Sequence, residues 1–207
     1  MRYRLSQLPG FLLPPIVLRP LTALYRVLQS SIARARIGKL AKLHLACGRN
    51  VMQGWANLDI EGPWRVIKHD LTQRLPVASN SMDAVYSEHF IEHIEKRHAE
   101  ALLRECCRVL RLSTPDLRRL VDEYLAGRLD YWADMNWKPA SPADLLNEGL
   151  SLWGHQFVFD TAELEALLKR CGFSRVERRG WRESPHPHVA NLECRPFHGE
   201  LIYDCVK

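Results

Sequence analysis

Hydrophobic and polar positions follow one another along most of the chain with the periods of strands and helices. From Lys39 onward, short apolar runs predict strands at Lys42–Ala46, Ala56–Ile60, Val66–His69, Met82–Ser87, Arg111–Ser113, Arg175–Arg179 and Leu201–Val206. Longer amphipathic stretches predict helices at Arg97–Leu110, Pro115–Leu125 and Thr161–Cys171. Strands that alternate with helices are typical of an α/β domain with a mostly parallel sheet and right-handed crossovers. We therefore expect one such domain over residues 39–207.

The first 38 residues have a different pattern, both apolar and basic. No Asp or Glu precedes Asp59, and the prolines at positions 9, 14, 15 and 20 are expected to break any helix before it could span a bilayer. An A-x-A-like cleavage site does not follow the apolar run, which argues against a signal peptide. We expect residues 1–38 to form a helical extension. It either packs on the domain with a solvated basic face or makes peripheral contact with anionic lipid.

Charge and cysteine content narrow the class of protein. The net charge of +5 belongs to the N-terminal segment, because the rest of the chain is close to neutral and carries no basic stripe. No specific nucleic-acid partner is therefore expected. The six cysteines show no C-x-x-C spacing, which favours reduced thiols. We expect a cytoplasmic protein, with peripheral attachment at the inner membrane surface as the alternative that the extension leaves open.

A glycine turn follows the first predicted strand and carries the first sign of a ligand. Leu45-Ala-Cys-Gly48 ends that strand, Asn50 can open a helical turn, and Asp59 ends the next strand. Exposed backbone N–H groups and a carboxylate at strand ends suit an adenosine-containing cofactor. The second and third glycines of G-x-G-x-x-G are missing, so a dinucleotide is not expected.

An ordered set of motifs extends this pattern: Gly54-Trp-Ala-Asn-Leu-Asp59, His69-Asp-Leu71, Asp83-Ala-Val-Tyr-Ser-Glu-His-Phe-Ile-Glu-His93, Leu102-Leu-Arg-Glu-Cys-Cys-Arg-Val-Leu110 and Ser113-Thr-Pro-Asp-Leu117. From about Lys42 to the C-terminus the chain resembles the class I S-adenosylmethionine-dependent methyltransferases, in particular the bacterial type-11-like branch often found with surface-polysaccharide genes. The resemblance implies a Rossmann-like fold of about seven strands with helices on both faces. It also implies methyl transfer from S-adenosylmethionine to a small-molecule or glycan-type acceptor.

The resemblance also assigns cofactor-binding residues. The loop under the methionine part corresponds to Leu45, Ala46, Cys47, Gly48 and Asn50. Asp59 corresponds to the acid that binds the ribose hydroxyls, with Ile60 beside the adenine. Asp70 and Leu71 correspond to the adenine contact, and Ser87 and Glu88 to the strand end that faces the methyl group. All of these positions fall at carboxyl ends of predicted parallel strands, where open α/β sheets bind ligands.

Two histidines are candidates for catalysis. His89 leads because its strand delivers it to the ligand edge, and a histidine of near-neutral pKa suits removal of a proton from a hydroxyl or amine acceptor. The alternative is that His89 only shapes the pocket. His155 is the second candidate, for acceptor contact, because residues 127–160 follow the fifth strand and contain Trp132, Trp137 and Trp153. We expect this segment to form a lid and acceptor surface.

Two other functions compete with methyl transfer. His89-Phe-Ile-Glu-His93 matches the H-x-x-E-H motif of inverted zinc hydrolases. That motif belongs in the middle of a helix, whereas here it directly follows a predicted strand, so no metal ligand is expected. The third possibility is a catalytically silent cofactor-binding or scaffold protein.

That possibility rests on a departure from the family pattern. Leu110 runs straight into Arg111, where a glycine-rich turn is expected between helix and strand. Either residues are missing between Leu110 and Arg111, which we favour, or the helix unwinds early, near Cys106–Arg108.

Overall fold

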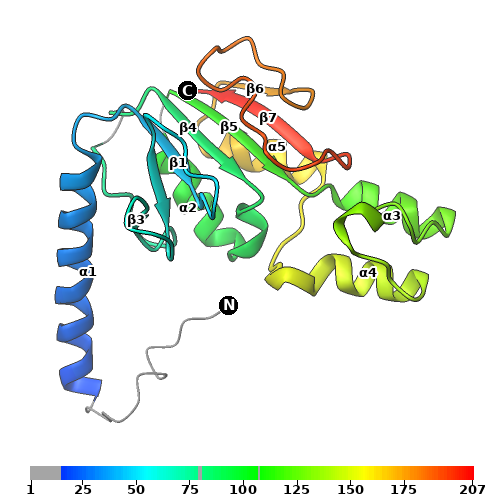
Figure 1. Cartoon of the computed structure of the whole chain (residues 1–207), viewed down its shortest axis with the longest axis horizontal. Coiled ribbons are helices and arrows are strands. Elements are labelled where there is room, and N and C mark those ends of the chain that lie inside the picture. Colours follow the sequence, from blue (N-terminus) through cyan, green and yellow to red (C-terminus); the bar gives the residue numbers. More distant parts are fainter. Residues whose placement is uncertain (1–14, 79–80, 107) are drawn as a thin grey trace.

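The computed structural model describes residues 15–78, 81–106 and 108–207 (Figure 1). Residues 1–14 of the extension lie outside the described residues. Seven strands form one sheet in the order β3-β2-β1-β4-β5-β7-β6. They are β1 (Lys42–Leu45), β2 (Ala56–Asp59), β3 (Ile67–Lys68), β4 (Ala84–Glu88), β5 (Val109–Thr114), β6 (Arg175–Arg178) and β7 (Leu201–Val206). The first five strands pair in parallel, and β7 pairs antiparallel with β5 and β6. The expected Rossmann-like, mostly parallel sheet is confirmed.

Five α-helices in the described part of the chain accompany the sheet: α1 (Pro15–Ile37), α2 (Lys96–Glu105), α3 (Leu117–Ala126), α4 (Pro142–Ser151) and α5 (Thr161–Arg170). The main core joins apolar side chains of α2 and α5 to one face of the sheet, where Val85 and Leu110 are fully buried. Helix α4 was not expected from the sequence. It begins with Ser141, whose Oγ accepts a hydrogen bond from the Asp144 N–H, and with Pro142 at its first position.

The other face of β4 and β5 is covered by a loop. Tyr86 and Arg111 point to this face, and Trp55 and Val189 pack beside Tyr86. Helices were expected on both faces, but over these two strands the segment between β6 and β7 supplies the cover. The buried guanidinium of Arg111 needs hydrogen-bond acceptors on this face. The loop supplies Glu193 and the Glu183 carbonyl, and β7 supplies Asp204.

The chain reverses between α2 and β5 without a glycine in the turn. Strand β5 runs unbroken through Leu110 and Arg111, which pair with Val85 and Tyr86 of β4. The predicted helix Arg97–Leu110 ends earlier, at Glu105, and Cys106 already has extended backbone angles of φ −63° and ψ 142°. The gap that we favoured between Leu110 and Arg111 is therefore wrong, and the early end of the helix is what makes the reversal.

Helix α1 lies at the β3 edge of the sheet (Figure 1). It runs from Pro15 through Pro20, so the expectation that this proline would break the helix is wrong. Pro20 is the sixth residue of α1, so its missing N–H removes one hydrogen bond near the start of a 23-residue helix that continues beyond it to Ile37. Among the described residues there is no helix both long enough and apolar enough to cross a membrane.

Beyond β5, helices α3 and α4 pack together at the end of the molecule opposite α1 (Figure 1). They share a small core of Leu120, Trp137 and Leu145, which is separate from the main core. We call residues 117–154 the cap. The cap stands beside the carboxyl edge of the parallel strands, which is the edge that binds ligands in open α/β sheets.

Candidate active site

The glycine turn and Asp59 meet at the carboxyl edge of β1 and β2. The Gly48 N–H donates to Asp59 Oδ2 at 2.8 Å, and the Glu61 N–H donates to Asp59 Oδ1 at 3.2 Å. Gly48 has a φ of +53°, and a Cβ at this position would meet no atom within 4 Å. The turn therefore needs glycine for its backbone angle and stays open toward the side from which a ligand can approach.

The other residues expected at the adenine end lie on the same edge but in different environments. Asp70 caps its own turn, with Oδ1 accepting from the Thr72 N–H at 2.9 Å and from the Thr72 hydroxyl at 2.6 Å. Leu71 is buried in the main core, so a ligand can reach only its backbone. Ile60 is 53% exposed and offers an apolar surface next to Asp59.

The residues expected under the methionine end also differ in what they can offer. Leu45 is a core side chain. Ala46 has a φ of +51°, and the Asn50 N–H donates to the Cys47 carbonyl at 2.9 Å, which closes the turn. Burial raises the pKa of the Cys47 thiol to about 11, so it is a neutral group in this turn. Ser87 is buried, and its Oγ has no hydrogen-bond partner in the described part of the chain.

Glu88 holds a loop in place. Its carboxylate accepts from the Cys194 N–H at 3.1 Å, the Arg195 N–H at 3.2 Å and the Cys194 thiol at 2.9 Å. Burial and the hydrogen bond to Glu88 raise the pKa of Cys194 to about 11. The side chain expected to face the cofactor thus fastens the segment before β7 to the end of β4.

His89 lies between two acids at the end of β4. Its φ of +50° turns the chain out of the strand, and its N–H donates to the Ser113 carbonyl at 2.9 Å. His89 Nδ1 is 3.5 Å from Glu92 Oε1, and Nε2 is 3.8 Å from Glu200 Oε1. Burial, with a smaller contribution from Arg195, lowers the pKa of His89 to about 3. The ring is therefore neutral at physiological pH and can accept a proton only weakly.

Glu92 is a fully buried acid that the sequence analysis considered only as part of the zinc motif. Its Oε2 accepts from the Thr114 hydroxyl at 2.9 Å, whereas its Oε1 has no hydrogen-bond partner among the described residues. Burial raises the pKa of Glu92 to about 7. The motif itself lies in the turn after β4 and in the short 3₁₀-helix η2 (Ile91–His93). This is not the mid-helix arrangement of a zinc hydrolase.

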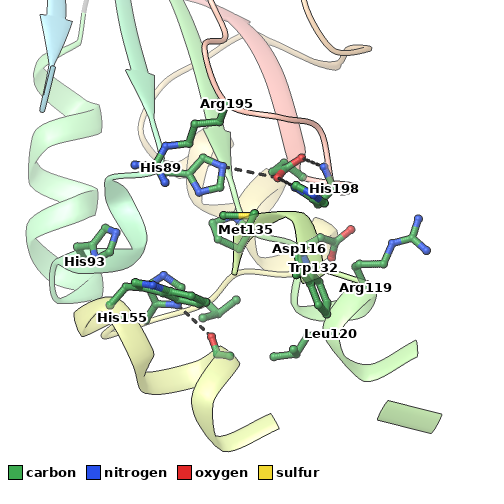
Figure 2. Close-up of a pocket in the computed structure, with 15 residues that line it drawn as sticks. His89, His93, Asp116, Arg119, Leu120, Trp132, Met135, His155, Arg195 and His198 are labelled. Carbon is green, nitrogen blue, oxygen red and sulfur yellow. Dashed lines mark hydrogen bonds and ion pairs between the residues drawn. The ribbon is translucent and has the colours of Figure 1, made fainter. Parts of the chain in front are cut away.

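A cavity of about 200 Å³ lies between the end of β4, the cap and the start of β7 (Figure 2). His89 and His155, both expected at the site, line it, and so does His93. Sequence reasoning did not predict the other charged or titratable lining residues, which come from α3, its N-terminus and the segment before β7: Asp116, Arg119, Arg195, His198 and Glu200. No local motif marks them, because only the fold brings them together.

Comparisons with known proteins agree with this geometry. Residues 42–113 match the family model of a methyltransferase domain. None of the curated proteins compared with the chain matches it.

Solved structures that are similar to the chain include three methyltransferases. One is an S-adenosylmethionine-dependent methyltransferase from Archaeoglobus fulgidus, which is 16% identical with a TM-score of 0.48 over 88% of this chain and 94% of that chain. Another is an S-adenosylmethionine-dependent methyltransferase from Mesorhizobium loti, which is 18% identical with a TM-score of 0.48 over 84% of this chain and 95% of that chain. The third is magnesium protoporphyrin IX methyltransferase from Synechocystis, which is 13% identical with a TM-score of 0.41 over 96% of this chain and 86% of that chain. Identities this low say nothing about the acceptor of this protein.

The family match covers the glycine turn, Asp59, Asp70 and the whole of β4 and its following turn. The sheet has the mostly parallel order that this family's fold requires. Residues 42–113 are therefore similar to a methyltransferase domain, and this segment includes every residue that the sequence predicted for cofactor binding.

Proposed function

We propose that this protein transfers a methyl group from S-adenosylmethionine to a small-molecule or glycan-type acceptor whose reactive end enters the cavity beside His89. The observation that supports this proposal is the position of the cavity. It begins at the end of β4, next to the edge that carries the glycine turn and Asp59. A methyl donor on that edge and an acceptor in the cavity would meet at His89.

The residues at the cofactor edge fit the expected ligand. Asp59 would hold the ribose hydroxyls, Ile60 would cover the adenine, and the open turn at Gly48 would receive the methionine part. The unpartnered Ser87 Oγ offers a polar contact that the protein itself leaves unused. When bound, the cofactor supplies an electrophilic methyl group on a sulfonium, so the protein has mainly to position the acceptor and receive a proton.

The cavity favours a compact acceptor group. Its volume of about 200 Å³ is below the roughly 300–1,000 Å³ of pockets that enclose drug-sized ligands. Trp132 and Trp153 supply flat apolar surface in the wall, and Arg195 and Glu200 supply charge. Such a lining suits one sugar ring or another flat ring that carries a polar substituent. A longer glycan would place only its terminal unit here.

His89 is the proposed proton acceptor. Because burial lowers its pKa to about 3, it would take the proton only as methylation makes the acceptor's O–H or N–H group strongly acidic. His89 Nδ1 is directed at Glu92 and Nε2 lies 3.8 Å from Glu200 Oε1, so an acceptor hydroxyl or amine that gives its proton to Nε2 would bind beside Glu200. Ionised Glu92 would stabilise the imidazolium that forms, as the acid does in other carboxylate–histidine pairs. His155 supports the acceptor from the cap side of the cavity.

The proposal is tested first through the cofactor. We expect Asp59→Asn to weaken S-adenosylmethionine binding by about tenfold or more, because hydrogen bonds to a charged carboxylate contribute about 1.5–3 kcal/mol. Isothermal titration calorimetry with S-adenosylmethionine and S-adenosylhomocysteine measures this. Asp83→Asn is the matched control, since Asp83 is exposed at the opposite end of β4. If the unchanged protein binds neither compound, the proposal fails.

A second, independent part of the proposal concerns the extension. We propose that α1 makes peripheral contact with anionic lipid at the cytoplasmic side of the inner membrane. Val27, Leu28 and Ile32 are exposed along α1, and the basic residue Arg34 follows, whereas Arg36 donates to the Val66 and Trp64 carbonyls of the domain. Ala33 and Ile37 on the same helix are buried against the domain, so the contact would use only the face that remains exposed.

A further inference from the structure

Three side chains from two parts of the chain converge on the wall of the acceptor cavity. Glu92 and His93 belong to η2 after β4, and His155 follows the cap. One ligand atom from each lies within 4.8 Å of the other two. Figure 2 shows His93 and His155 on the same side of the cavity, and their ring centroids are 4.9 Å apart.

Among the described residues, the carboxylate of Glu92 has a hydrogen-bond partner at only one of its two oxygens. Thr114 holds Oε2, which directs Oε1 toward the histidines, and Oε1 is 3.7 Å from His93 Nε2. Glu92 is fully buried, yet Oε1 has no hydrogen-bond partner in the described part of the chain. Burial of an unpaired carboxylate oxygen is unfavourable, so its place beside two imidazoles needs an explanation.

The hydrogen bonding around His155 leaves one nitrogen ready for a ligand. Its Nδ1 is 3.0 Å from the Gly149 carbonyl, and because a carbonyl only accepts, Nδ1 must carry the proton. In the neutral ring Nε2 then presents a lone pair. A backbone carbonyl that fixes the tautomer in this way is the usual support of a metal-binding histidine.

Two hydrogen bonds donated by Gln156 hold the two segments together. The Gln156 N–H donates to the Glu92 carbonyl at 2.6 Å, and the Gln156 side-chain amide donates to the His93 carbonyl at 2.7 Å. The three side chains therefore belong to a preorganised unit, although His155 is distant from the other two in sequence.

We propose that Glu92, His93 and His155 bind a divalent transition-metal cation at the wall of the acceptor cavity. Two imidazoles and one carboxylate suit Zn²⁺, Mn²⁺ or Fe²⁺, and three protein ligands leave coordination positions open toward the cavity. Those positions would take oxygen atoms of an acceptor that carries a hydroxyl or carboxylate group. This role for the cation rests on the proposed methyl transfer, whereas binding of the cation does not.

The test is calorimetric titration of the chelator-treated, dialysed full-length protein with MnCl₂ and, separately, ZnCl₂. We expect one equivalent of at least one of these cations to bind to the unchanged protein. His93→Ala and His155→Ala should each weaken that binding at least tenfold. His188→Ala is the matched control, because His188 is an exposed histidine in the segment before β7, and it should bind as the unchanged protein does.

Circular dichroism and S-adenosylmethionine titration of each variant distinguish a lost ligand from a lost fold, and His155→Gln provides a milder substitution at the same position. If the unchanged protein binds no equivalent of either cation, or if the folded cavity variants bind like the control, the metal site is wrong. Intact cofactor binding in that case would leave the proposed methyl transfer standing. If the protein binds the cation but not the cofactor, the metal site stands and the proposed methyl transfer fails.

Discussion

At the scale of single residues, His89 can be tested apart from the cofactor. Because its ring faces the cavity between Glu92 and Glu200, His89→Ala should lower methyl transfer by about 10²–10⁴-fold, the usual contribution of a positioned acid or base. Affinity for S-adenosylmethionine should change little. The measurement uses cofactor with a labelled methyl group and fractionated small-molecule and glycan extracts.

A His89→Ala variant that transfers at the original rate would show that His89 only shapes the pocket. If the unchanged protein binds the cofactor but transfers to none of the fractions, the catalytically silent scaffold becomes the better description. The two outcomes are separable because the calorimetric and transfer measurements are independent.

Cys194 gives a pH-dependent prediction. It is exposed, but its thiol pKa of about 11 leaves only about one thiolate in a thousand molecules at pH 8. Alkylation by iodoacetamide should therefore be slow at pH 8 and rise about tenfold per pH unit up to pH 10. Glu88→Gln removes the acid that raises the pKa, so it should speed the reaction at pH 8. Peptide mass spectrometry after timed quenching measures both rates, and a fast reaction in the unchanged protein would contradict the expected pKa.

The sequence identified only the part of the site that lies at the ends of predicted strands. The glycine turn, Asp59 and His89 each end a strand, so periodicity and spacing were enough to place them on one edge. Arg195 and Glu200 reach the cavity through a long loop, and no periodic pattern reports where such a loop returns. Glu88 shows a related limit, since its burial under Cys194 follows from packing rather than from its position in the motif.

At the scale of elements, β5 and β7 are joined by a buried ionic network around Arg111. The guanidinium donates to Glu193 Oε1 at 2.6 Å and to Asp204 Oδ1 at 3.0 Å, and it also donates to the Gly180 and Glu183 carbonyls. This network attaches the covering loop to the sheet. The cavity, which this loop lines in part through Arg195, thus depends on a residue that does not line it.

Removing Arg111 should be costly because it leaves Glu193 and Asp204 buried without their partner. We expect Arg111→Leu to lower the free energy of unfolding by about 3–5 kcal/mol in urea titrations. Arg108→Leu is the control: its side chain is 73% exposed and 3.6 Å from Asp83, so it should change stability by less than about 1 kcal/mol. Equal effects of the two substitutions would show that the network adds little.

Element prediction succeeded where burial imposes a clear period. All seven strands were expected within a few residues of their observed bounds. The end of α2 was placed too late because Val109 and Leu110 continue the apolar pattern of the helix, while pairing with β4 draws them into the sheet. Helix α4 was missed because its segment is rich in Trp, Asn and Pro, and only packing on α3 stabilises it.

At the scale of the whole molecule, α1 carries several exposed apolar side chains among the residues that the structure describes, namely Tyr25, Val27, Leu28 and Ile32. If it lies on anionic lipid, the protein should co-sediment with phosphatidylglycerol liposomes at low salt, and less so at high salt. Leu28→Glu together with Ile32→Glu should reduce this binding severalfold. Leu125→Glu is the control, since Leu125 is exposed on α3 at the other end of the molecule. Equal binding by all forms would exclude this role of α1.

The separate core of the cap has a consequence for motion. Leu120, Trp137 and Leu145 pack with one another rather than with the main core, so we expect α3 and α4 to move away from the sheet more readily than the elements that share the main core. Such a unit opens at a lower free energy than the rest of the molecule. Amide protons of α4 should accordingly exchange with solvent before those of β4. The sheet would then hold the cofactor in a fixed position, while the cap opens to admit and release the acceptor.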